Sequence, residues 1–251
     1  MRVAVANQKG GTGKTTTVVN LAAAVAETGL RVLVVDLDAQ ANATTWLGAE
    51  QDTYDTLSVL LRDAGIDEAA VPSNVPGVEV VPATSELSSV ERALAGDVGV
   101  ELRLRVALDR ATPRDVVLVD CVPALGLLTV AGMAAADTVL VPVLPGALEL
   151  EAVAQLLGTV EKVAEALAPH LAVGHLLVCG AGTRTRMDRD VIATLRRRFP
   201  RETMQTVIGR TVRLAEAYAR RQPITVYDPT GKAAEQYRAA AAELLAARGT
   251  A

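Results

Sequence analysis

Short apolar runs alternate along this chain with longer stretches in which apolar residues recur every three or four positions. The apolar runs predict buried strands at residues 3–6, 31–36, 78–81, 115–120, 138–142 and 175–179. The longer stretches predict helices at residues 14–27, 56–63, 86–94, 100–110, 147–167 and 239–247. Strands that alternate with helices form βαβ units, so we expect an α/β fold: a doubly wound, mostly parallel sheet with helices on both faces. The rest of residues 50–75 is expected to form surface loops without identifiable chemistry.

The composition favours one large core. The chain has 251 residues, of which 50% are hydrophobic and only 2% are aromatic, so Ala, Val and Leu must fill the interior. We expect a single domain over residues 1–251. The first strand follows Met1 directly and no apolar run has the length of a membrane span, which predicts a cytoplasmic protein without a signal peptide. Cys121 and Cys179 lack the spacing of metal ligands and are expected to be small buried residues that stay reduced.

A glycine-rich turn, in the sequence AVANQKGGTGKTTT at residues 4–17, joins the first strand to the first helix. Its glycines let the backbone approach an anion, and the N-terminus of the helix adds the positive end of its dipole. Lys14 is predicted to reach the β- and γ-phosphates of a nucleotide, and Thr15 to bind Mg²⁺. Such a turn can also serve only as a connection, but Gly-Lys-Thr at a strand-to-helix junction favours the phosphate loop of a P-loop NTPase.

Two later strands end in aspartate. Asp36 and Asp38 follow the strand at 31–36, and Asp120 ends the strand at 115–120. Ligands bind at the carboxyl ends of parallel strands, so these side chains are expected to approach the phosphate loop. Asp120 fits a Walker B carboxylate that holds Mg²⁺ through water, although a turn aspartate at a strand end is the alternative. Cys121, directly after it, cannot serve as a catalytic base.

The phosphate loop differs from the general pattern, because Gln8 stands where glycine is usual and Lys9 is an additional cation. The segment KGGTGKT at 9–15 resembles the deviant Walker A box of the ParA/MinD family of ATPases. The segments at 36–48, 120–137, 183–199 and 207–229 also resemble this family, so the resemblance covers essentially the whole chain. The chain departs from the family's usual residues at Ala39, Ala41, Val122, Gly209 and Thr211.

This resemblance implies an ATPase that uses ATP and Mg²⁺ and turns over slowly without a partner. It gives catalytic roles to Lys9, which would cross a dimer interface to the partner's nucleotide, to Lys14, and to Asp38, which would position the attacking water. The implied nucleotide-binding residues are Lys9, Gly10, Gly11, Thr12, Gly13, Lys14, Thr15, Thr16, Ile208, Arg210 and Thr211. The implied Mg²⁺ ligands, partly through water, are Thr15, Asp38 and Asp120.

Positive charge is concentrated near the C-terminal third. Residues 184–221 contain eleven arginines and four acidic residues, a local charge of +7 that leaves −11 for the rest of a chain whose net charge is −4. The resemblance implies that Arg184 and Arg213 contact DNA, and Arg186 is a further candidate. A solvated helix face is the alternative, and for residues 196–198 both interpretations stay open.

The chain thus resembles ParA/Soj-type chromosome or plasmid partitioning ATPases. The resemblance implies a sandwich homodimer with ATP that binds double-stranded DNA on the nucleoid without sequence preference. Hydrolysis, stimulated by a ParB-like centromere-binding protein, would release it. The first strand begins so close to Met1 that no N-terminal helix-turn-helix domain is expected.

Three alternative functions are known among related ATPases. A ParA-like ATPase that positions a protein cargo has nearly the same motifs and is not separated by them. A MinD-like membrane-associated ATPase would need a basic amphipathic C-terminal helix, whereas the chain ends in mostly alanine. A relative with an iron–sulfur cluster would need thiolate ligands that Cys121 and Cys179 are poorly placed to supply.

Overall fold

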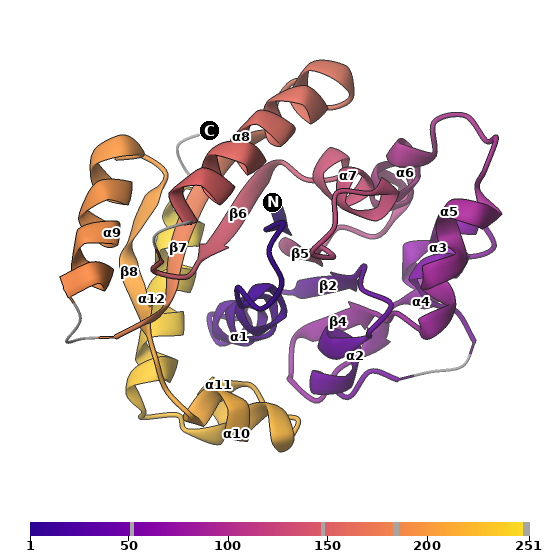
Figure 1. Cartoon of the computed structure of the whole chain (residues 1–251). Coiled ribbons are helices and arrows are strands. Elements are labelled where there is room, and N and C mark those ends of the chain that lie inside the picture. Colours follow the sequence, from indigo (N-terminus) through magenta and orange to yellow (C-terminus); the bar gives the residue numbers. More distant parts are fainter. Residues whose placement is uncertain (51–52, 147–148, 183–185, 248–251) are drawn as a thin grey trace.

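The computed structural model describes residues 1–50, 53–146, 149–182 and 186–247, and these form one eight-stranded sheet with helices on both sides (Figure 1). The strand order is β3-β4-β2-β5-β1-β6-β7-β8, and within the described residues every neighbouring pair is parallel except β3 with β4 at one edge. The strands are β1 (Arg2–Val5), β2 (Val32–Asp36), β3 (Val71–Pro72), β4 (Val78–Val81), β5 (Val116–Asp120), β6 (Thr138–Val143), β7 (Ala172–Ala181) and β8 (Thr203–Gly209). The expected α/β architecture is confirmed.

The helices divide between the two faces of the sheet. One face is covered by α1 (Lys14–Ala26), α2 (Asn42–Trp46), α10 (Arg213–Ala219), α11 (Ile224–Tyr227) and α12 (Lys232–Ala246). The other is covered by α3 (Thr56–Leu61), α4 (Ile66–Ala69), α5 (Val90–Ala93), α6 (Arg103–Arg110), α7 (Leu127–Ala134), α8 (Glu149–Ala166) and α9 (Arg186–Arg198). Within the described residues, no helix is both long and apolar enough to cross a membrane.

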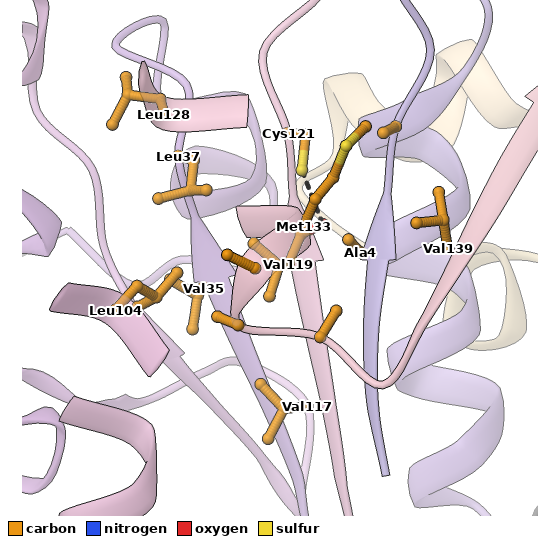
Figure 2. Close-up of a cluster of buried hydrophobic side chains, with 14 of the residues drawn as sticks. Ala4, Val35, Leu37, Leu104, Val117, Val119, Cys121, Leu128, Met133 and Val139 are labelled. Atoms are coloured by element: carbon orange, nitrogen blue, oxygen red, sulfur yellow. Dashed lines mark hydrogen bonds between the residues drawn. The ribbon is translucent and has the colours of Figure 1, made fainter. Parts of the chain in front are cut away.

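The central strands have continuous apolar sequences because both of their faces are buried. Successive side chains of a strand point to opposite faces. Val117 and Val119 of β5 therefore pack on the α7 side, whereas Val116 and Leu118 pack on the α1 side. Figure 2 shows the first of these clusters, with Met133 of α7 beside Val119. Such two-sided burial is typical of a parallel sheet between helix layers.

The close packing of α7 depends on Gly132. A Cβ atom there would lie 2.8 Å from Cδ1 of Leu37 and 2.9 Å from Sγ of Cys121. Cys121 is 1% exposed, and its thiol donates weakly to the carbonyl oxygen of Val119 at 3.9 Å. The expectation that Cys121 and Cys179 are small buried residues is confirmed.

All six predicted strands are present, but several elements were missed or misassigned. The predicted loops within residues 50–75 also contain α4 and the edge strand β3, and α2 was not predicted. The helix predicted at 86–94 begins as a 3-10 helix at Ser85–Ser89, and the helix at 100–110 begins as one at Val100–Leu102. The last helix begins at Lys232, earlier than predicted, and residues 147–148 of the 147–167 helix lie outside the described residues.

Strand β8 was missed for a physical reason. It is an edge strand, so it needs no continuous apolar run. Its polar Gln205 and Thr206 lie near the surface, where the Glu243 carboxylate of α12 accepts hydrogen bonds from both backbone N–H groups at 2.8 and 2.7 Å.

Candidate functional site

The turn between β1 and α1 has the geometry of a phosphate loop. Gly11 and Gly13 adopt φ angles of 74° and 89°, in the left-handed region that favours glycine. The Asn7 side chain fixes the start of the loop, because its Oδ1 accepts from the N–H of Lys9 at 3.0 Å and its Nδ2 donates to the Pro142 carbonyl at 2.8 Å. The loop ends at Lys14, the first residue of α1.

Lys14 folds back over this loop. Its ammonium nitrogen donates to the Lys9 carbonyl oxygen at 3.2 Å, and the Thr12 hydroxyl donates to the same oxygen at 3.3 Å. Burial lowers the pKa of Lys14, while the negative charges of Asp120 and Asp38 act to raise it. The ammonium group therefore lies near both carboxylates, inside the loop where the phosphates are predicted. Lys9 itself is exposed.

Asp36 and Asp120 lie side by side, because they are paired residues at the ends of the adjacent strands β2 and β5. The Asp36 carboxylate is used structurally: Oδ2 accepts from the N–H and the hydroxyl of Thr44 at 2.9 and 2.8 Å, and Oδ1 accepts from the N–H of Asp38 at 3.1 Å. Burial raises the pKa of Asp36 to about 6. Asp38 is only partly buried, which leaves it as the aspartate available for chemistry after β2.

Asp120 is the least satisfied group of the site. It is 1% exposed, and neither carboxylate oxygen has a hydrogen bond of normal geometry within the described residues. Burial and the neighbouring Asp36 raise the pKa of Asp120 well above its ordinary value, whereas the nearby Thr15 hydroxyl and the Lys14 ammonium act to lower it. A buried carboxylate without partners is costly unless a cation completes the site.

The residues fit Mg²⁺. Thr15, Asp38 and Asp120 offer only oxygen atoms, which are the ligands that Mg²⁺ prefers. Among the described residues, no group of three or more His, Cys, Asp or Glu side chains could hold a metal ion. The protein side chains would therefore supply only part of a Mg²⁺ coordination shell, and phosphate oxygens and water would supply the rest.

A cavity of about 520 Å³ extends from the phosphate loop to α10. This volume is within the range of small-molecule and cofactor sites. Of the predicted nucleotide-binding residues, those that line the cavity are Gly11, Thr12, Gly13, Thr15, Thr16, Ile208, Arg210 and Thr211. Lys9, Gly10 and Lys14 belong to the same loop but lie outside this lining. The structure thus brings together two segments that are almost 200 residues apart.

Much of the cavity wall opposite the phosphate loop was not predicted from the sequence. The cavity is also lined by Asn42, Trp46, Leu144, Cys179, Tyr218 and Tyr237. The chain has one Trp, four Tyr and one Phe, and three of these six aromatic residues line this one cavity. Because aromatic residues are so rare in this chain, each of them was a candidate for a binding site, and this rarity could have indicated Trp46, Tyr218 and Tyr237.

Of the three candidate DNA-contacting arginines, the structure describes Arg186 and Arg213. Arg184 lies outside the described residues. Arg186 begins α9 with a side chain that is 90% exposed, and Arg213 begins α10 at 56% exposed. Each lies near one acidic residue of its own helix, Asp190 at 3.8 Å and Glu216 at 3.0 Å. Exposed ion pairs contribute little stability, so both arginines could exchange these partners for phosphates.

The preceding strands β7 and β8 are neighbours, and the N–H of Arg210 donates to the Ala181 carbonyl at 2.9 Å where both strands end. Helices α9 and α10 therefore follow strands that end at the edge of the sheet that holds the phosphate loop. Residues 196–198 are exposed in the last turn of α9, where Arg196 donates to the Gln205 carbonyl at 3.0 Å.

A phosphate loop with Lys14 and Thr15, opposite a buried aspartate at the end of the neighbouring strand, defines the class of protein: the chain is a P-loop ATPase. Comparison with known proteins specifies it further. A family model described as an AAA domain matches residues 1–173. The sporulation initiation inhibitor protein Soj of Bacillus subtilis is 40% identical over 250 residues, which cover 97% of this chain and 98% of that protein. The chromosome-partitioning ATPase Soj of Thermus thermophilus is 43% identical over 247 residues, which cover 98% and 95%. The chain belongs to the ParA/Soj family of chromosome-partitioning ATPases.

The solved structure of a similar protein supports ATP and Mg²⁺ as the cofactors. Cobyrinic acid a,c-diamide synthase from Mycobacterium smegmatis, with bound ATP analog and magnesium, matches with a TM-score of 0.84 and 35% sequence identity, over 97% of this chain and 93% of that one. The synthase activity in that name is a statement about that protein. The nucleotide and magnesium bound there agree with the phosphate loop and the buried aspartate of this chain, and ATP and Mg²⁺ are the cofactors of this ATPase.

Proposed function

We propose that the protein is a DNA-partitioning ATPase, formed by a single domain over residues 1–251. In this proposal its ATP-bound homodimer binds double-stranded DNA without sequence preference and releases the DNA after hydrolysis. The main support is one arrangement: Lys14, Asp38 and Asp120 meet at the phosphate loop, and two helices that begin with exposed arginines follow strands ending at the same edge of the sheet. Relatives of this chain are named as chromosome-partitioning proteins, which also supports this function.

In the proposed mechanism, Lys14 holds the β- and γ-phosphates, and the backbone of residues 10–13 surrounds them. A bound Mg²⁺ would be held by Thr15 and, through water, by Asp38 and Asp120, and it would offset the negative charge of the phosphates. Asp38 orients the attacking water. Cys121 cannot act as a base, because burial keeps the pKa of its thiol far above neutral pH. The isolated protein should therefore turn over slowly.

Lys9 is proposed to act on the nucleotide of the partner subunit. Lys14 is already inside the loop, where it donates to the Lys9 carbonyl. The Lys9 side chain belongs to an exposed part of the same loop. A second cation would offset charge where two nucleotides face each other in a sandwich dimer.

DNA binding is proposed to use Arg184, Arg186 and Arg213. Lys and Arg contacts to phosphate carry no sequence information, and their summed effect increases with the number of contacts. Dimerisation doubles that number, so only the ATP-bound form should bind duplex DNA well. The rest of the chain is acidic, which favours a ParB-like centromere-binding partner that presents a basic segment. The protein would then act on the nucleoid, in the cytoplasm.

The test is a DNA mobility shift with ATP, ADP and no nucleotide, at two salt concentrations. The parent should bind with ATP only, with a steep salt dependence, and Arg213→Ala should weaken binding to all sequences alike. Arg110→Ala, an exposed arginine at the end of α6, is the matched control and should have no effect. Binding that ignored the nucleotide, or that survived the loss of both Arg186 and Arg213, would argue for a cargo-positioning ATPase that uses another surface.

A further inference from the structure

The nucleotide cavity has two chemically different ends. The phosphate loop forms one end, so the base and sugar of a nucleotide must extend toward the other. The lining outside the phosphate loop includes Trp46 of α2 and Tyr218 of α10. Their rings lie 5.0 Å apart at an angle of 77°, an edge-to-face contact. Any nucleotide long enough to fill the cavity therefore reaches a place where two separate helices touch.

Helix α2 is tied to the catalytic aspartate. The N–H of Ala41 donates to the Asp38 carbonyl at 2.8 Å, and Ala41 has a φ of 51°, which is uncommon for a residue other than glycine. The buried Asp36 carboxylate holds Thr44, in the middle of α2, through two hydrogen bonds of 2.8 and 2.9 Å. A shift of α2 would therefore move the backbone around Asp38.

Helix α10 is tied in turn to α2. The Trp46 indole donates from Nε1 to the Gln222 carbonyl at 2.8 Å, and the Tyr218 hydroxyl donates to Oδ1 of Asn42 at 3.1 Å. Trp46 is only 3% exposed, so its ring is held firmly, while Tyr218 is 41% exposed. Further on, the Arg221 carbonyl accepts a hydrogen bond of 2.6 Å from Asn74. These contacts fix the C-terminal end of α10.

The other end of the same seven-residue helix is Arg213. Its guanidinium donates to Oε2 of Glu216 at 3.0 Å, and the Tyr227 hydroxyl donates to that same oxygen at 3.0 Å. Arg213 thus begins a short helix that also lines the cavity, through Leu214, Ala215 and Tyr218. A continuous chain of contacts connects Asp38, α2, the aromatic pair and Arg213.

We propose that Trp46 and Tyr218 are positioning residues that make the placement of α10, and with it Arg213, depend on the nucleotide in the cavity. The inference rests on the nucleotide-dependent DNA binding proposed above and names the contact that transmits it. A ligand changes an equilibrium only through contacts that differ between two states. The aromatic pair provides such a contact, because it lines the cavity and joins the two helices.

Trp46 gives a direct signal, since it is the only tryptophan of the chain. Its fluorescence should differ between the nucleotide-free, ADP-bound and ATP-bound protein with Mg²⁺ present. Identical spectra in all three states would overturn the inference, because the ring would not sense the cavity.

The decisive variant is Tyr218→Ala, studied at nucleotide concentrations that saturate each protein. The ratio of DNA affinities with ATP and with ADP should fall by roughly fivefold or more, the scale of a typical coupling between sites. Tyr218→Phe keeps the ring and loses only the hydrogen bond to Asn42, so its ratio should fall by about twofold. Tyr54→Ala is the matched control, because Tyr54 is similarly exposed at 39% and lies near α3. Its ratio should equal that of the parent.

Light scattering on the same samples separates the outcomes. A reduced ratio in a variant that still dimerises with ATP supports the inference. A reduced ratio that merely accompanies loss of the dimer overturns it, as does a parental ratio in both Tyr218 variants. If Tyr218→Ala does not fold, Tyr218→Phe decides. If the DNA affinity of the parent protein does not depend on the bound nucleotide, the proposed function is refuted as well. If the parent and both Tyr218 variants depend on the nucleotide to the same extent, only this inference is refuted.

Discussion

Asp120→Asn is expected to stabilise the nucleotide-free protein while it impairs function. The Asp120 side chain is 1% exposed, and its oxygens lack hydrogen bonds of normal geometry within the described residues. An unsatisfied buried polar group costs about 1–3 kcal/mol and a charged one costs more, and asparagine relieves only the excess that is due to the charge. Asparagine has nearly the same shape without the charge. We therefore expect the free energy of unfolding to rise by about 1–3 kcal/mol, which for a chain of this length raises Tm by roughly 2–12 °C.

The effect should depend on pH. Burial, with a contribution from Asp36, raises the pKa of Asp120 well above its ordinary value of 3.8. Between the ordinary and the raised pKa, the unfolded chain has already released a proton that the folded chain keeps, so the stability of the parent falls as pH rises. Asparagine does not titrate. The advantage of the variant should therefore be smallest at the acid end of the folded range and should grow toward neutral pH.

Thermal and urea unfolding without nucleotide, at about pH 5 and about pH 8, measure this difference. Adding Mg²⁺ and ATP should stabilise the parent and have much less effect on the variant, because a ligand stabilises only the state that binds it. Asp109→Asn is the matched control: its carboxylate is 55% exposed and pairs with Arg2, so its stability should change by no more than about 0.5 kcal/mol. An Asp120→Asn variant that is no more stable than the parent at either pH would show that the buried charge of Asp120 does not destabilise the fold.

Three further predictions concern catalysis, dimerisation and packing. Asp38→Ala should bind ATP and accumulate as dimer while ATP turnover falls by roughly a hundredfold or more, the scale of losing a positioned catalytic group; equal turnover in a coupled assay would remove Asp38 from the mechanism. Lys9→Ala should leave ADP binding largely intact and weaken ATP-dependent dimerisation, so a normal dimer by light scattering would contradict action on the partner's nucleotide. Gly132→Ala should destabilise the protein by about 1–3 kcal/mol in urea unfolding, because its methyl group would meet Leu37 and Cys121 below 3.0 Å; unchanged stability would show that α7 can shift.

The sequence alone determined the parts of this protein that depend on local chemistry. A strand buried on both faces needs a continuous apolar run, so the central strands were readable, whereas the edge strands β3 and β8 were not. The phosphate loop was readable because Gly11 and Gly13 occupy backbone conformations that few other residues adopt. The end of each aspartate-bearing strand also indicated a site, since parallel strands present their carboxyl ends at one edge.

Only the tertiary structure decided how the remaining residues are used. Asp36 and Asp38 are nearly alike in sequence, and the hydrogen bonds to Thr44 separate a structural carboxylate from one available for chemistry. The wall formed by Trp46 and Tyr218 brings together residues more than 170 positions apart, on two short helices that carry little periodicity of their own. Such contacts depend on how helices pack across the sheet. No local pattern encodes that packing, because its free energy comes from burial that exists only after the chain has folded.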